Sequence, residues 1–341
     1  MVQHKRFRRI LGRAASQDLF ALLETPPQRF GAALLAGFFR RLTGLNESGR
    51  GRLYLNVGHT GLDSPGFRQW LSQAEVKPIY FVHDLIPITH PQFCRPGEDR
   101  RHRERMRSAL MTGQGIIANS QSTLDELAQF GAREGLPTPA ALAAWLGVDQ
   151  LPRQRAALHD GRPTFVTLGT IEARKNHLLL LNIWSRLVDR LGSDTPRLLI
   201  IGQRGWEADE AFKLLDTSEK LRGHVSELNR CSDEDLARHL TSARALLFPS
   251  LAEGYGLPLV EALGAGVPVI ASDLPVFREV GGAIPDYLHP RDELAWEAAI
   301  LDYSNPASAA RAAQLRRIQS FRLPDWQMHF RSVEAWLRTL G

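Results

Sequence analysis

Two carboxylates eight residues apart, Glu253 and Glu261, offer the clearest chemistry in the chain. They flank a turn that carries two glycines, and Pro258 stands where a first helical residue is favoured. A Gly-rich turn that opens a helix presents free backbone N–H groups and the positive end of the helix dipole, which together suit anionic oxygens. A carboxylate suits a vicinal diol, because it accepts hydrogen bonds from two hydroxyls at once. The stretch therefore predicts a site for a ligand that carries both phosphate and sugar.

A second stretch with binding chemistry is Gly169-Thr170-Ile171-Glu172-Ala173-Arg174-Lys175-Asn176, between a predicted strand and a predicted helix. Its adjacent Arg and Lys can clamp a diphosphate, the guanidinium as a planar fork and the ammonium as a point charge. The alternative is a solvated surface pair, which is the commoner role of such residues taken alone. No Walker A and no G-x-G-x-x-G occurs, which argues against a P-loop enzyme and an NAD oxidoreductase.

Polar residues also follow three predicted strands of the first half of the chain. The strands are 53–57, 78–82 and 115–118, and ligands collect at the carboxyl ends of parallel strands. A lone His at the end of a strand is more often structural. The prediction of a ligand site therefore rests on finding polar residues at the ends of all three strands. The residues at these ends are Gly58, His59, His83, Asp84, Asn119 and Ser120.

Alternating strands and helices predict an α/β protein of two parallel-sheet domains, since 341 residues suffice for about two cores. We place the first domain at 1–155, the second at 156–320 and a terminal helix at 321–341. Residues 131–163 read as irregular, with one short strand at 146–149, and the chain after Asp286 reads as helical. Residues 1–50 read as helical and basic, so the first strand is predicted only at 53. The other predicted elements are helices 65–74, 99–112, 124–130 capped at Ser122, 177–191, 232–242 and 325–340, and strands 164–168, 197–201, 243–248 and 267–271.

The string E-G-Y-G-L-P-L-V-E at 253–261, with P-S before it and E-A-L-G-A-G-V-P-V-I-A-S-D overlapping and following it, resembles the E-x7-E signature of retaining glycosyltransferases of family 4. The resemblance covers about 50–320 and implies the GT-B fold, in which two Rossmann-like domains face each other across a cleft. It also suggests that the terminal helix crosses back to the first domain. Family enzymes begin with a strand and a Gly-rich turn that helps to form the acceptor side, whereas residues 1–50 of this chain read as helical and basic. This difference leaves acceptor binding and activity open.

The resemblance assigns roles to the residues singled out above. Glu253, with the amides of 254–257, would hold the donor sugar, and Glu261 the ribose diol. His83 would lie within reach of the transferred sugar, with Asp84 a weaker candidate for the acceptor base. The acceptor-side residues would be Gly58, His59, Asn119 and Ser120. The donor-binding residues would be Gly169, Thr170, Arg174, Lys175, Gly202, Arg204, Gly254, Tyr255, Gly256, Leu257 and Glu261, with Gly202 and Arg204 facing the base.

The implied reaction transfers a hexose from a GDP- or UDP-linked sugar to a hydroxyl, and mannose is the first candidate for that hexose. The expected acceptor is a lipid-linked saccharide in surface polysaccharide biosynthesis. We expect front-face attack assisted by the leaving phosphate, no cofactor and no metal. The acidic run Asp233–Asp235 follows Ser232 and reads as a helix start rather than a metal site. The alternative function is a non-catalytic nucleotide-sugar-binding subunit of a glycosyltransferase complex.

The net charge of +5 is concentrated in two basic runs, residues 4–13 and 95–107. Either run could be a solvated face or a contact to an anionic membrane, and the apolar segment 30–41 could be an interfacial or a core helix. Nothing resembles a nucleic-acid module. Two cysteines without CxxC spacing, and no apolar signal core, predict a cytoplasmic protein, with peripheral contact to the inner face of the plasma membrane as the second hypothesis.

Overall fold

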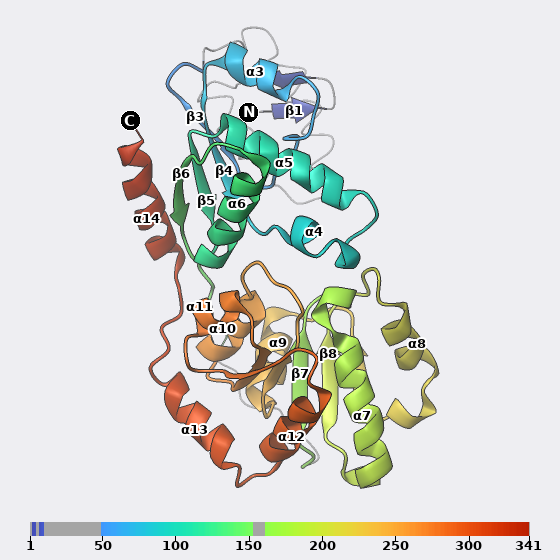
Figure 1. The fold of residues 1–341 in the computed structure, drawn as a ribbon. Helices are drawn as coiled ribbons and strands as arrows, with labels where there is room; N and C mark the ends of the chain where they lie inside the picture. Colours follow the sequence, from blue (N-terminus) through green and yellow to red (C-terminus); the bar gives the residue numbers. More distant parts are fainter. Residues whose placement is uncertain (1, 5–6, 10–48, 153–160, 341) are drawn as a thin grey trace, which may run out of the picture.

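The computed structural model describes residues 2–4, 7–9, 49–152 and 161–340, which form two α/β domains stacked end to end (Figure 1). Two short strands at the start, β1 (Val2–His4) and β2 (Phe7–Arg9), pair antiparallel. The prediction of helix over 1–50 is therefore wrong for these two strands. The apolar segment 30–41 and the predicted boundary at 155/156 lie outside the described residues.

The first domain is a four-stranded parallel sheet in the order β3-β4-β5-β6. The central strand β4 is buried from its second residue onward, as expected when both faces of a parallel sheet are covered. The strands are β3 (Leu53–Asn56), β4 (Lys77–Val82), β5 (Gly115–Ala118) and β6 (Ala140–Ala143), and the helices are α3 (Phe67–Ala74), α4 (Ile86–Thr89), η1 (Pro91–Phe93), α5 (Glu98–Thr112) and α6 (Gln121–Glu134).

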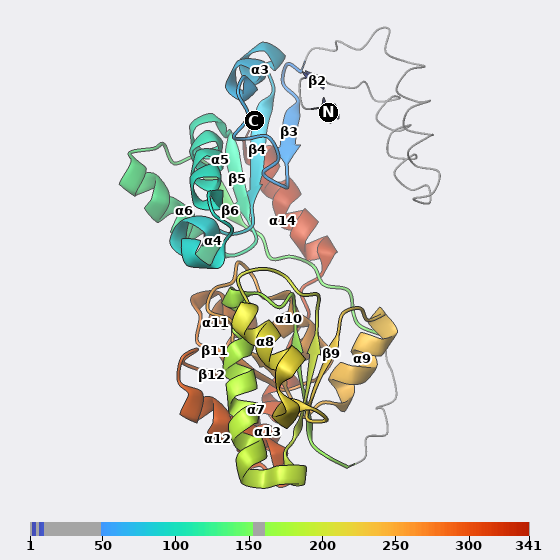
Figure 2. The ribbon, with the colours of Figure 1, turned by 90° about the vertical axis from the view of Figure 1, so that its right-hand side faces the viewer.

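Different helices cover the two faces of this sheet. On one face α3, α5 and α6 bury a core that includes Tyr80, Met106 and Phe130. On the other face Phe81 and its neighbours pack against the last helix, α14 (Trp326–Thr339). The end of the chain thus returns from the second domain to the first, as Figures 1 and 2 show.

The second domain is a six-stranded parallel sheet in the order β12-β11-β10-β7-β8-β9. The chain runs outward from β7 to β9 and then returns to the other side of β7 with β10. The order therefore reverses between β7 and β10, and the crevice at such a switch point is the usual ligand site of an open α/β sheet. The strands are β7 (Thr164–Leu168), β8 (Arg197–Ile201), β9 (Val225–Leu228), β10 (Leu246–Phe248), β11 (Val269–Ser272) and β12 (Asp286–Leu288).

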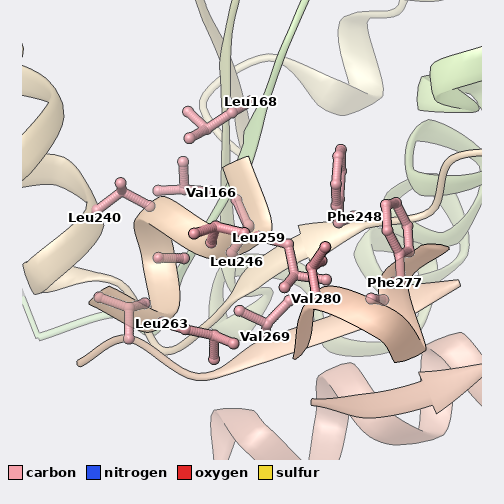
Figure 3. Close-up of a cluster of buried hydrophobic side chains, with 14 of the residues drawn as sticks. Val166, Leu168, Leu240, Leu246, Phe248, Leu259, Leu263, Val269, Phe277 and Val280 are labelled. Carbon is pink, nitrogen blue, oxygen red and sulfur yellow. The ribbon is translucent and has the colours of Figure 1, made fainter. Parts of the chain in front are cut away.

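Two hydrophobic clusters hold the second sheet between its helices. Figure 3 shows one cluster, in which Val166, Leu246 and Val269 meet side chains of the helices on that face. Its Phe248 and Phe277 rings stack at 4.7 Å between centroids. The helices on this face are α9 (Asp233–Ser242), α10 (Leu257–Gly264), α11 (Pro275–Gly281) and α13 (Ala309–Ile318), and those on the other face are α7 (His177–Leu191), α8 (Asp209–Thr217) and α12 (Glu293–Ser304). Three single turns, η2 (Ala173–Lys175), η3 (Gly192–Asp194) and η4 (Glu219–Leu221), complete the domain.

The predicted helix 177–191 is confirmed to the residue, and the acidic run Asp233–Asp235 forms the first turn of α9 behind its N-cap Ser232. Three predictions are wrong. The last strand of the first sheet is 140–143 rather than 146–149, a strand at 286–288 precedes the helices that end the chain, and Ser120 rather than Ser122 caps α6. No helix among the described residues is long and apolar enough to span a bilayer.

Candidate active site

The two predicted donor loops leave β7 and β10, the strands that flank the switch point of the second sheet. Glu253, in the loop after β10, binds residues of the loop after β7. One carboxylate oxygen accepts from Lys175 Nζ at 2.5 Å and from Ser250 Oγ at 2.8 Å. The other lies 2.9 Å from Arg174 Nη1. The structure thus brings the loop carboxylate and the Arg-Lys pair into direct contact.

This contact is a buried, balanced charge cluster. Arg174 also pairs with Glu172 at 2.7 Å, so two acids face two bases. Burial would raise the pKa of Glu253, but Lys175 and Arg174 outweigh burial and hold that pKa below its usual value. Glu172, buried but with fewer compensating contacts, has a raised pKa. In this state the positive charges of Arg174 and Lys175 are balanced by Glu172 and Glu253.

Backbone crowding explains two of the glycines predicted for the donor site. A Cβ on Gly202 would lie 2.0 Å from the Gly169 carbonyl oxygen. Gly256 has a φ of +107° and faces the Phe277 ring. Side chains at these positions would push the loops after β7 and β10 out of place. Their requirement for glycine is therefore structural, and it fixes the backbone of the loops at the switch point.

The side chains of two predicted donor residues form hydrogen bonds with other parts of the protein instead. Arg204 donates hydrogen bonds to Glu227 and Asp216 on the outer side of the sheet. The ring of Tyr255 is buried, and its hydroxyl donates to the Leu146 carbonyl at 3.1 Å. Both side chains thus hold the fold together, and the interpretation that Arg204 faces a base has no support in its contacts.

The helix after the Gly-rich turn begins without a side-chain cap. α10 begins behind Gly256 with no side-chain cap and no acidic residue in its first turn, and Leu257 is 40% exposed. Glu261 lies further along this helix, half-buried, and burial together with the charge of Asp233 raises its pKa. Its carboxylate makes no hydrogen bond or ion pair with a described residue, so it can accept from a diol.

The predicted His83 is held by the ends of the neighbouring strands. Its Nε2 donates to the Val57 carbonyl at 2.6 Å, and its own carbonyl accepts from Asn119 Nδ2 at 2.9 Å. Because a carbonyl only accepts, the proton of the neutral ring is fixed on Nε2 and Nδ1 is left as an acceptor. Next to it Asp84 accepts from the Ile86 amide at 3.0 Å.

Two further histidines form a cluster with His83. His59 lies 5.5 Å from His83 and 5.4 Å from His102 between ring centroids. Burial, and then the nearby His102 and His83, lower the pKa of His59 to about 3. His59 is therefore a neutral, buried support of the site. Gly58 beside it accepts a 3.4 Å hydrogen bond from Thr60 Oγ1.

The two domains touch at the centre of the predicted site. A Cβ on Gly254 would lie 2.3 Å from the His83 carbonyl oxygen, so only glycine allows this approach. The Gly254 carbonyl accepts from Ser120 Oγ at 3.2 Å and from Thr123 Oγ1 at 3.3 Å. The strand ends of the first domain and the Gly-rich turn of the second thus lie in direct contact, which sequence spacing alone could not show.

Comparisons with known proteins agree with this geometry. Residues 149–283 match the family described as Glycosyl transferases group 1. The second domain, most of which this match covers, is similar to that family and is here named the group 1 domain. The chain is 31% identical over 217 residues to the serotype-specific mannosyltransferase WbdA of Escherichia coli, covering 59% of this chain but 26% of that protein. It is 28% identical over 263 residues to the O-antigen chain mannosyltransferase B of the same species, covering 74% and 67%. The chain is therefore homologous to O-antigen mannosyltransferases and matches about a quarter of the length of WbdA.

Solved structures settle the fold. The sucrose-phosphate synthase of Thermosynechococcus elongatus superposes with a TM-score of 0.66 at 17% identity, covering 92% of this chain and 80% of that one. TarM superposes with a TM-score of 0.61 at 14% identity, covering 85% and 54%. The two parallel-sheet domains of this chain have the GT-B fold, as the E-G-Y-G-L-P-L-V-E string suggests.

Sequence reasoning missed Glu279, which lies on α11 of the group 1 domain. Its carboxylate accepts from the backbone amides of Gln121 at 2.8 Å and Ser122 at 3.0 Å, and from Trp145 Nε1 at 2.8 Å. The two amides are the first of α6, where an anion is favoured by the helix dipole. A carboxylate of one domain therefore binds the helix start of the other, and no local pattern around Glu279 signals this.

We expect Glu279→Ala to lower the free energy of unfolding by roughly 1–2 kcal/mol, since three hydrogen bonds to one charged group are lost. Glu279→Gln should lie between the parent and Glu279→Ala, because an amide oxygen still accepts. Urea denaturation measures the loss, and small-angle scattering shows whether the domains separate. Glu234→Ala, an exposed acid on α9, is the control. Equal stability of both Glu279 variants and the parent would contradict the interdomain role.

The first residue of α7, His177, yields a prediction of pH dependence. It is 2% exposed, and neither ring nitrogen has a hydrogen-bond partner among the described residues. Burial, with Lys175 nearby, lowers its pKa to about 4. The unfolded chain therefore binds this proton near pH 6.5, while the folded chain resists it until about pH 4.

Stability should accordingly fall as pH drops from about 6.5 toward 4, with His177 contributing about 1.4 kcal/mol per pH unit. His177→Leu removes this contribution and leaves no donor or acceptor unpaired, so its unfolding free energy should depend less on pH. Urea denaturation of both proteins between pH 7 and 4 is the measurement. Parallel curves for parent and variant would contradict the assignment.

Proposed function

We propose that this chain is a retaining glycosyltransferase that moves a hexose, mannose in the first instance, from a GDP- or UDP-linked sugar to a hydroxyl of a lipid-linked saccharide in surface polysaccharide biosynthesis. One observation carries the proposal. Glu253 joins the loops after β7 and β10 at the switch point of the group 1 domain, and the next residue, Gly254, lies against His83 and Asp84. The names of the homologous O-antigen mannosyltransferases support the sugar and the pathway class.

Each residue of the proposed site is assigned to the part of the donor that it would contact. Arg174 and Lys175 neutralise the diphosphate, together with the uncapped start of α10. Glu253, released from the two cations by the incoming phosphates, accepts from hydroxyls of the donor sugar. Glu261 holds the ribose diol. Nδ1 of His83, a residue that lies against Gly254, accepts from no described residue. Catalysis then rests on positioning and on stabilisation of the departing diphosphate.

The experiment that tests the proposal is a thermal-shift panel of nucleotide sugars followed by a transfer assay with and without EDTA. A bound donor at 100 times its Kd stabilises the protein by about 2.7 kcal/mol. We expect one GDP- or UDP-sugar to stand out, and transfer to survive chelation, because side chains rather than a metal balance the diphosphate. Loss of transfer that Mg²⁺ or Mn²⁺ restores would contradict the metal-independent part. Binding of the donor without transfer would favour the alternative, a non-catalytic nucleotide-sugar-binding subunit.

We also propose a cytoplasmic location with peripheral contact to an anionic membrane. The structure limits which charges can contribute. Of the six arginines in 95–107, four form ion pairs with Asp63, Glu98 or Glu134, and Arg95 stacks on Trp206. Arg100 makes no such contact with a described residue and is exposed. Within residues 95–107, the positive charge that remains available to an anionic membrane is therefore centred on Arg100.

A further inference from the structure

A groove of about 640 Å³ lies between the start of α3 and the middle of α5, on the first domain. Both helices lie on the same face of the first sheet, with α3 further from the second domain (Figure 1). The groove does not include the strand ends or the two loops of the proposed donor site. Its lining is Leu62, Asp63, Ser64, Pro65, Gly66, Phe67, Arg68, Gln69, Arg100, Arg101, Glu104 and Ser108.

Two exposed guanidinium groups face this groove from different helices. Arg68 belongs to α3 and Arg100 to α5, and neither makes a hydrogen bond or ion pair with a described residue. Their neighbour Arg101 differs, because it is held by Glu98 at 2.6 Å and by Asp63 at 3.5 Å. Arg68 and Arg100 therefore remain available for a ligand, and a pair of free guanidiniums favours an anion with several oxygens.

Uncharged donors complete the lining. α3 begins behind Gly66 with no side-chain cap and no acidic residue in its first turn, so the positive end of its dipole faces no protein carboxylate in that turn. Ser108 on α5 is 3% exposed, and its hydroxyl has no partner among the described residues. A buried hydroxyl without a partner is costly, which indicates that a ligand oxygen satisfies it when the groove is filled.

We propose that this groove binds a phosphate group through Arg68, Arg100, Ser108 and the amides of Arg68 and Gln69 at the start of α3. Two acids limit the charge of the site. Asp63 is already paired with Arg101 and Arg105, whereas Glu104 is exposed and makes no ion pair with a described residue. Glu104 is thus the group that weakens binding, and its removal should strengthen it. The proposal goes beyond the proposed function and does not depend on it.

The test compares the parent with Arg68→Gln/Arg100→Gln and with Arg133→Gln/Arg338→Gln, a control that removes the same charge from exposed arginines of α6 and α14. One arm titrates inorganic phosphate by calorimetry, because pyrophosphate would also bind the diphosphate site proposed at Arg174 and Lys175. The other co-sediments the proteins with phosphatidylcholine vesicles that contain or lack phosphatidic acid. We expect the groove variant to lose about tenfold in affinity, as for one charge-assisted contact or more, and the control to change less than twofold.

The two arms separate the sources of the phosphate. A specific loss with inorganic phosphate alone supports a soluble phosphorylated compound. A loss with vesicles alone supports a lipid headgroup, and a loss in both supports the phosphate group from either source. The proposed donor site is intact in all three proteins, so a nucleotide sugar should shift their melting temperatures equally. Equal binding by the groove variant and its control in both arms would overturn the proposal.

Two single substitutions sharpen the result. Glu104→Gln should raise the affinity, since it removes the opposing charge. Ser108→Ala should lower the affinity while leaving the melting temperature unchanged or raised, because the substitution removes a buried hydroxyl that has no partner in the folded protein. A serine with a purely structural role would show the reverse, with a lower melting temperature and unchanged affinity. That reverse pattern, or a weaker site in Glu104→Gln, would overturn the assignment of the groove.

Discussion

Glu253→Ala is expected to lower the free energy of unfolding by about 3–5 kcal/mol, the usual result of removing one partner from a buried ion pair. Lys175 is 8% exposed and loses its carboxylate contact, and Arg174 keeps Glu172 but loses its second acid. Urea denaturation at pH 7 is the measurement. A loss below about 1 kcal/mol would mean that water already screens the cluster.

The pH dependence of this effect has a fixed sign. The folded-state pKa of Glu253 is lowered, so its contribution is complete above the unfolded value near 4.3 and is lost as pH falls through the folded value. The difference between parent and Glu253→Ala should therefore shrink in acid. Lys175→Met in the Glu253→Ala background supplies the control, because it removes the unpaired ammonium and should recover part of the loss.

The sequence could predict those parts of the candidate site whose polar residues all lie within one short segment. Gly169 to Asn176 and Glu253 to Glu261 each join a strand to a helix, and their residue types alone indicate phosphate and diol contacts. The exact match of α7 has the same cause, since its apolar spacing and its flanks are local. Pattern reasoning also gave the parallel sheets, because strand and helix signals alternate along the chain.

What sequence could not predict are the contacts between segments far apart. That Glu253 rests on Arg174 and Lys175, 79 and 78 residues away, follows from the order of β7 and β10 in the sheet. The hydrogen bonds from the first amides of α6 to the Glu279 carboxylate join residues of different domains. The strand β6 was missed because its Ala-Ala-Leu-Ala residues carry little strand preference and pair only through their place beside β5.

In the proposed donor site some groups are expected to act on donor binding and others on the chemical step. Two substitutions separate them. Lys175→Ala should lower the single-turnover rate of transfer by about 100-fold, the usual loss when one charge-stabilising contact to a transition state is removed. Its contact strengthens as negative charge builds on the leaving diphosphate, and in the resting state it is shared with Glu253. Arg174 still holds Glu253 in this variant, so folding is retained and donor affinity should change little.

Glu261→Ala should act in the opposite way. The ribose is remote from the reacting carbon and is bound alike before and during transfer, so the loss appears in donor affinity, by roughly 1.5–3 kcal/mol for a charged acceptor of two hydroxyls. That loss is about tenfold to a hundredfold in Kd, measured by calorimetry beside rapid-quench transfer at saturating donor. Glu234→Ala on the neighbouring helix α9 is the charge-matched control. A folded Glu261→Ala protein that binds GDP- and UDP-sugars as well as the parent would show that α10 does not hold the ribose, and the donor would then have to lie elsewhere in the crevice between β7 and β10.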